Sequence, residues 1–165
     1  MHLQNASANV KYNSHLQNAS TFETFFMNSE KKRSDCPVSC SLDIWGDKWS
    51  LLIIRDLMSA KACTYGDFLK SPEGIATNIL ASRLKVLEEN KIIEKLAHPD
   101  SKAKGLYKLT RKGIDLLPIL VEVNLWGEKY FDTPQDRKAL LKEVKKDKSG
   151  FIQTMTKEME GQSGG

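Results

Sequence analysis

One short segment combines residue types and a spacing that suit contact with the edges of DNA bases. Its chemically useful members are Thr77, Asn78, Ala81, Ser82 and Lys85. The apolar residues Leu80, Leu84 and Leu87 recur at i, i+4 and i+7, so a helix would gather them into one stripe. At 100° per residue Asn78, Ser82 and Lys85 fall on the opposite side, with Thr77 and Ala81 at its edge. Asparagine can make paired hydrogen bonds with adenine, lysine can reach guanine, and methyl groups suit thymine. This face therefore predicts base contacts in the major groove, unless it is an ordinary solvated helix face.

The elements that would hold this face follow a recognisable order between residues 64 and 112. Apolar residues at helical spacing indicate the helices, branched and aromatic residues indicate the strands, and Ser, Pro and Gly mark the breaks. The predicted order is helix 64–70, turn 71–74, helix 75–90, strand 92–96, loop 98–105 and strand 106–109. This order describes a winged helix-turn-helix, which is a mainly α-helical fold with a small β-hairpin wing. The module usually reads DNA.

Charge is concentrated on the hairpin and its flanks. The whole chain carries a net charge of +4, whereas residues 91–112 hold seven basic and two acidic residues, a net +5. Such a stretch is typical of phosphate contact, although a solvated lysine face has the same composition. We expect Lys102 and Lys104, at the tip of the wing, to contact phosphate or the minor groove without base specificity. Arg83 flanks the apolar stripe and would either hold the helix to the core or reach a phosphate.

A long helix predicted over 110–131 carries more apolar surface than one domain can cover. Pro118 lies inside it and should kink it, because proline has no backbone N–H to donate. The surplus apolar surface predicts a homodimer joined through terminal helices, with help from a helix over 37–45. The expected interface residues are Leu116, Leu120, Val123, Trp126 and Tyr130. The alternative is that the charged segment 135–160 folds back and covers this surface.

Cys36 is the candidate for a redox or electrophile switch. It precedes the helix predicted over 37–45 and follows the basic residues 31–33, and both features favour a reactive thiolate. The alternative is a capping or small apolar residue without a signalling role. If Cys36 is a switch, the effector of this protein would be a small molecule or an oxidant.

Composition excludes several other classes of protein. The sequence has no Gly-rich phosphate loop, no His-Glu-x-x-His and no nucleophile elbow, so we expect no enzyme activity and no cofactor. Three cysteines without ligand-spaced histidines indicate no metal site. No apolar run is long enough to span a membrane and no targeting segment is evident, which favours a cytoplasmic protein.

Three regions are expected along the chain. The motif His-Leu-Gln-Asn-Ala-Ser stands at 2–7 and again at 15–20, so residues 1–33 are predicted to be a disordered or added tail. Residues 34–132 form the winged helix-turn-helix domain with its dimerisation helices. Residues 133–165 form a charged helical extension with a flexible end.

Several motifs in this order resemble the HxlR-type winged helix-turn-helix transcription regulators. They are Cys36-Pro37-Val38, the core helix from Gly46 to Leu57, the turn and helix from Pro72 to Leu87, the entry Leu106 to Thr110, and Trp126-Gly127. The resemblance implies a homodimer that binds double-stranded DNA and regulates nearby genes, and two recognition helices would read a pseudo-palindrome. Thr64-Tyr65 replaces the family's common Arg-Phe, and the wing lacks its usual proline and arginine. A different interpretation is a winged-helix scaffold for protein interactions, which would favour a neutral or acidic wing and an apolar recognition face.

Overall fold

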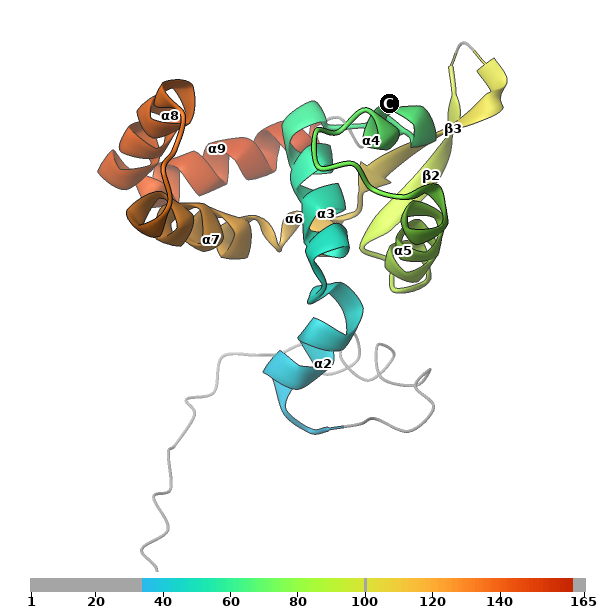
Figure 1. Cartoon of the computed structure of the whole chain (residues 1–165), viewed down its shortest axis with the longest axis horizontal. Coiled ribbons are helices and arrows are strands. Elements are labelled where there is room, and N and C mark those ends of the chain that lie inside the picture. The colour runs from blue at the N-terminus through green and yellow to red at the C-terminus, as the bar shows by residue number, and fades with distance from the viewer. Residues whose placement is uncertain (1–33, 100, 162–165) are drawn as a thin grey trace, which may run out of the picture. The chain divides into compact units, whose positions relative to one another are not determined.

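The computed structural model describes residues 34–99 and 101–161, and of residues 101–104 it describes the backbone alone. The predicted tail, residues 1–33, lies outside this part. The chain divides into two units, residues 1–35 and 36–165, and every element below belongs to the second. In chain order these are α2 (Pro37–Trp45), α3 (Lys48–Ala60), β1 (Cys63–Thr64), α4 (Tyr65–Leu69), α5 (Thr77–Glu89), β2 (Ile93–His98), β3 (Ser101–Leu109), α6 (Arg111–Ile114), α7 (Leu117–Tyr130), α8 (Gln135–Lys146) and α9 (Lys148–Glu160) (Figure 1).

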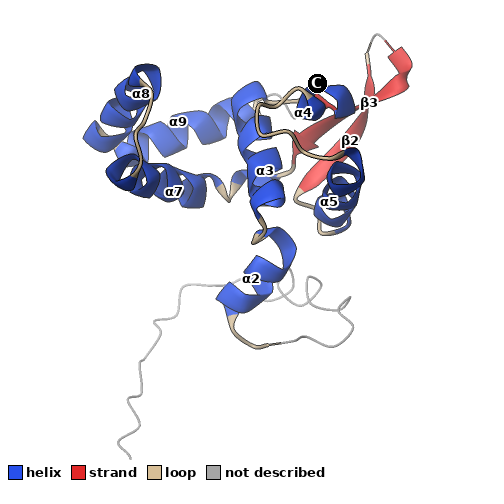
Figure 2. Cartoon of the chain, in the orientation of Figure 1, coloured by secondary structure: helices blue, strands red, loops and turns tan. Residues whose placement is uncertain are grey.

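The mainly helical fold with a small wing is confirmed. Figure 2 shows helices throughout and one small sheet, in which three antiparallel strands lie in the order β1-β3-β2. The pairing of β2 with β3 sets Ile93 opposite Leu109 and Glu94 opposite Lys108. The third strand, β1, was not predicted, because two residues are too few to show the alternation that marks a strand. It places Cys63 opposite Tyr107, and both side chains are buried.

Helix α5 forms because one of its faces can be buried completely. Leu80, Leu84 and Leu87 are at most 3% exposed and join the core with residues of α3, α4 and the sheet. The predicted stripe is therefore confirmed. The helix begins two residues later than expected, since the turn before it needs Gly74 at a φ of +67°, where a side chain would be strained.

Helix α4 has only five residues and depends on its cap. Short helices are marginal without tertiary contacts. A capping box links the Thr64 and Asp67 side chains with the free amides of the first turn. Phe68, at 2% exposure, anchors the helix in the core. These two contacts fix the first half of the helix-turn-helix.

The wing differs from its predicted form. A loop was expected over residues 98–105, but β2 extends to His98 and β3 begins at Ser101. Strand propensity along Ser, Lys, Ala and Gly is weak, and cross-strand pairing overrides it. The backbones of Lys102 and Lys104 consequently lie in strand β3 rather than in a loop at the tip.

The single long helix predicted over 110–131 was wrong. Helix α6 ends at Ile114, and α7 begins at Leu117 with Pro118 in its first turn. Proline is favoured there, because the first amides of a helix have no carbonyl partner within it and the fixed φ of the ring suits the helix. Pro118 therefore starts a helix instead of kinking one.

Helices α8 and α9 fold back onto α7, as the alternative interpretation proposed. Leu141, Val144 and Met159 are buried, and Leu141 and Val144 line a cavity together with Leu120 of α7. Lys148 of α9 pairs with Glu122 of α7 at 2.5 Å, and Lys145 of α8 pairs with Glu128. Figure 1 shows these three helices gathered on the side of α3 opposite the sheet. The boundary at residues 132 and 133 between a reading domain and an extension stays a prediction.

Candidate nucleic-acid interface

The predicted base-reading set lies together on the outer face of α5. Thr77, Asn78, Ala81, Ser82 and Lys85 are all exposed. The Lys85 side chain is 76% exposed, and its ammonium lies 3.8 Å from the carboxylate of Glu89. A surface pair at that distance contributes little energy, so the lysine can exchange its partner for a base or a phosphate. The face thus offers amide, hydroxyl, methyl and ammonium groups at helical spacing.

Arg83 joins α5 to the start of α3. Its Nε lies 3.3 Å from Oδ1 of Asp47, although the angle does not make a hydrogen bond. Asp47 caps α3 by accepting from the backbone amides of Trp49 and Ser50. Burial acts to raise the pKa of Asp47, but hydrogen bonds from Ser50 and the charge of Arg83 hold it below the usual value. One carboxylate therefore stabilises both helices. The phosphate contact of Arg83 stays a prediction.

Tyr65 fixes the first residue of α5 and was not identified from the sequence. Its hydroxyl donates to the backbone oxygen of Thr77 at 2.8 Å. The bond spans the turn of the helix-turn-helix and ties the base-reading face to α4. No sequence signal could have revealed it, because the acceptor is a backbone atom.

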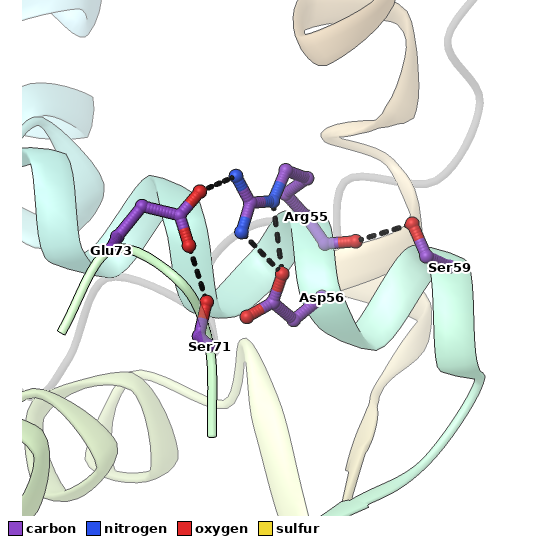
Figure 3. A network of polar contacts seen from close by, with 5 residues as sticks. All are labelled: Arg55, Asp56, Ser59, Ser71 and Glu73. Atoms are coloured by element: carbon purple, nitrogen blue, oxygen red, sulfur yellow. Dashed lines mark hydrogen bonds and ion pairs between the residues drawn. The ribbon is translucent and has the colours of Figure 1, made fainter. Parts of the chain in front are cut away.

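A polar network holds the turn that precedes α5 (Figure 3). Arg55 of α3 donates from Nη1 to Glu73 at 2.5 Å, and from Nε and Nη2 to Asp56 at 2.9 and 2.6 Å. Ser71 donates to the other carboxylate oxygen of Glu73. Hydrogen bonds from Arg55 and then Ser71 lower the pKa of Glu73 to about 2. The turn is thus attached to the core helix through a charged pair.

Some basic residues of the stretch 91–112 contact other parts of the protein. Lys112 donates to the backbone oxygen of Asn90 at 2.9 Å, and burial lowers its pKa. Arg111 pairs with Asp115 at 3.1 Å and also with Glu160. These two charges therefore serve the fold. The side chains of Lys102 and Lys104 lie outside the described part, so their contacts stay predictions.

The three cysteines occupy different environments. Cys36 is exposed and precedes α2, but its side chain makes no capping hydrogen bond with that helix. Cys40 is partly buried, whereas Cys63 lies in the core. Burial raises the pKa of the Cys63 thiol to about 11, and the charges of Asp56 and Asp67 add to the effect. Cys36 is thus the exposed cysteine of the three, and burial disfavours the thiolate of Cys63.

The predicted dimer residues divide into two groups. Leu116 and Leu120 are only 9% and 7% exposed and belong to the core of their own chain. Val123, Trp126 and Tyr130 are about half exposed, with Trp126 at 59%. The Trp126 ring lies 4.9 Å from that of Tyr130 and 5.7 Å from that of Phe131. We call the exposed residues Val123, Trp126, Tyr130 and Phe131 the α7 aromatic patch.

Helix α2 also carries exposed apolar side chains. None of its residues is buried, and Val38 and Leu42 are 65% and 49% exposed. Figure 1 shows the helix projecting past the N-terminal end of α3. In the described part of the chain, no helix has the length and apolar character needed to cross a membrane.

Comparison with known proteins decides the family. A family model described as HxlR-like helix-turn-helix matches residues 44–135. The chain belongs to the HxlR-like helix-turn-helix family. It is accordingly a transcription regulator of the winged-helix HxlR type, and members of this family are generally not enzymes. The resemblance seen in the sequence is confirmed.

Three proteins similar to this HxlR-type chain illustrate its sequence identity and structural likeness to known regulators. The HTH-type transcriptional regulator YodB of Bacillus subtilis is 31% identical over 96 residues, which cover 58% of this chain and 85% of YodB. PA1607, whose crystal structure is known, is 43% identical in sequence with a TM-score of 0.56. The match covers 63% of this chain and 71% of PA1607. The redox regulator HypR in its oxidized form is 28% identical in sequence with a TM-score of 0.53. The match covers 59% of this chain and 100% of HypR. The family match ends at residue 135, so α9 and all of α8 except its first residue lie beyond it.

Proposed function

We propose that this HxlR-type regulator binds a specific, pseudo-palindromic site on double-stranded DNA as a homodimer. The observation that carries the proposal is the polar outer face of α5, set opposite a fully buried leucine stripe. The helix is held by Tyr65, by the pair of Arg83 with Asp47, and by the turn attached to Arg55. A rigidly held helix with an exposed polar face is what major-groove reading requires.

The α7 aromatic patch and helix α2 support the homodimer. A contiguous aromatic cluster on a monomer surface often marks an interaction site. Trp126 and Tyr130 are residue types enriched at the centres of protein interfaces. A second copy using the same patch would form a two-fold interface. Its two α5 helices would then meet half-sites about one helical turn apart.

Cys36 supports control by a thiol switch. The thiol is exposed at the start of α2, whose exposed Val38 and Leu42 would join the dimer contact. The relative HypR is a redox regulator. Oxidation or alkylation of Cys36 would reposition α2 and change the spacing of the two α5 helices. Both half-sites would be affected together, because that spacing is fixed by DNA geometry.

The test is a mobility-shift titration on DNA from around the protein's own gene. Specific binding should fall steeply with salt, since each phosphate contact releases counterions. A scrambled duplex of the same length and composition is the control. Absence of binding, or equal and salt-insensitive binding to both duplexes, would contradict the proposal. The polar α5 face weighs against a scaffold that binds proteins alone.

A further inference from the structure

A cavity lies where α8 and α9 fold back against α3 and α7. Its volume is about 130 Å³, and most of its lining is apolar, including Met58, Leu120, Leu141, Phe151 and Met155. An open groove of about 410 Å³ adjoins it. The two share Arg55, Leu120, Asn124, Arg137 and Leu141, so together they form one continuous site. Nearly half of the residues that line the cavity belong to α8 and α9 and lie beyond the family match.

The polar residues of the cavity are cationic or neutral. Among the described residues that line it, Arg55 and Arg137 carry positive charge and none is acidic. The groove adds Lys48 and Glu128, and Glu128 is paired with Lys145. Arg137 is exposed on α8 and lines both the cavity and the groove. No described residue forms an ion pair with it, whereas Arg55 is paired with Asp56 and Glu73. An apolar space beside an uncommitted guanidinium is complementary to an anion with an apolar body.

We propose that this site binds a small carboxylate with an aromatic or branched apolar body. An apolar cavity of about 150 Å³ accommodates a benzene ring, so a ring of that size matches the volume of this half-open cavity. The carboxylate would extend into the groove and receive paired hydrogen bonds from Arg137, the geometry that guanidinium favours. A concave, mostly apolar surface with a few converging polar groups is typical of small-molecule sites.

Arg55 connects the site with the reading helix. The same residue that lines the cavity holds Glu73 in the turn before α5 (Figure 3). A carboxylate beside Arg55 would compete with Glu73 for the guanidinium and loosen that turn. The ligand would then weaken DNA binding, and this second step rests on the proposed function. The binding step itself does not depend on DNA.

Calorimetric titration of the full chain with 4-phenylbutyrate tests the site. We expect saturable binding of one molecule per chain, and at least tenfold weaker binding of 4-phenylbutanol, which has the same apolar body without the charge. Arg137→Ala should weaken binding of the carboxylate at least tenfold while its circular dichroism is unchanged. Lys142→Ala removes the same charge from the same helix outside the cavity and should bind as wild type does. No binding, equal binding of acid and alcohol, or equal loss in both variants would overturn the proposal.

DNA-binding titrations with and without 4-phenylbutyrate test the coupling. The carboxylate should weaken DNA binding by the wild type. Glu73→Gln removes the competing carboxylate, so it should bind 4-phenylbutyrate at least as tightly as the wild type and lose most of this effect on DNA binding. If the chain binds 4-phenylbutyrate but no DNA, the proposed function fails and the site stands. If DNA binding is normal and the carboxylate does not bind, the site fails alone. A change of molecular mass in Arg137→Ala with unchanged carboxylate affinity would assign the groove to a second copy of the chain, and so would overturn the ligand proposal.

Discussion

The hydroxyl of Tyr65 and the backbone oxygen of Thr77 form a 2.8 Å hydrogen bond that crosses the turn between α4 and α5. The bond fixes the N-terminal end of α5, where Thr77 and Asn78 begin the base-reading face. This hydrogen bond should determine how accurately α5 is oriented toward DNA, because a small rotation of the helix would move every base contact along it.

Replacing Tyr65 with phenylalanine should lower both stability and specific DNA affinity. Loss of one hydrogen bond costs about 0.5–1.5 kcal/mol of unfolding free energy. Urea unfolding and a DNA titration measure the two effects. Tyr107→Phe is the matched control, because Tyr107 is buried outside the proposed dimer and DNA contacts and the described residues show no hydrogen bond from its hydroxyl. Equal stability and affinity in both variants would mean that the bond does not position α5.

Substitutions on α5 and on the wing should have different consequences. Asn78→Ala or Lys85→Ala should cost about 1–3 kcal/mol of binding free energy and relax the preference at particular base pairs. Lys102→Ala or Lys104→Ala should weaken binding to all sequences alike and reduce the salt slope by about one unit. Titrations on single-base variants of the site at several salt concentrations separate the two classes. Altered preference in the wing variants alone would reverse the assignment.

Acid should destabilise the protein partly through Glu73. The folded-state pKa of Glu73 is lowered from 4.5 to about 2, mainly by Arg55. A carboxylate with a lowered pKa stabilises the fold above its ordinary pKa, and that contribution is lost as the pH falls from about 4.5 toward 2. The loss of unfolding free energy between pH 5 and pH 3 should therefore be smaller in Glu73→Gln. Asp67, whose pKa is also lowered to about 2, should still titrate in that variant.

The α7 aromatic patch should control the molecular mass. Trp126→Glu places a charge where the proposed interface is apolar, and it should give a monomer in sedimentation equilibrium at micromolar concentration. Leu69→Glu, at an exposed apolar residue on α4, should leave the mass unchanged. A monomeric wild type, or an unchanged mass in Trp126→Glu, would speak against this interface.

The cysteines should differ strongly in reactivity. Cys36 is exposed, whereas the Cys63 thiol is buried and its pKa is raised to about 11. N-ethylmaleimide should modify Cys36 first and Cys63 only after unfolding, as peptide mass spectrometry would show. Mild peroxide or a quinone should change DNA affinity in the wild type and leave Cys36→Ser unaffected. An identical response of both proteins would exclude Cys36 as the switch.

The parts of the fold that could be predicted from the sequence are those with a regular spacing of apolar residues. The stripe of Leu80, Leu84 and Leu87 was predictable because burial of one helix face repeats regularly along the chain. The pair of Arg55 and Glu73 was not, since it joins residues 18 positions apart through a turn. The break between α6 and α7 was not predicted, because the apolar pattern continues across it. The residues of α7 that are buried became clear only from the structure, in which α8 and α9 pack against that helix.

Strand β3 lies between β1 and β2, and this central position has a consequence for local opening. Because β1 leads directly into α4, the wing cannot separate from the helix-turn-helix without breaking the pairing of Cys63 with Tyr107. Fluctuations of the wing base and of α4 should therefore be cooperative. Their amide hydrogens would then exchange with solvent as one group, and a phosphate contact made by the hairpin would slow exchange in the helix that it never touches.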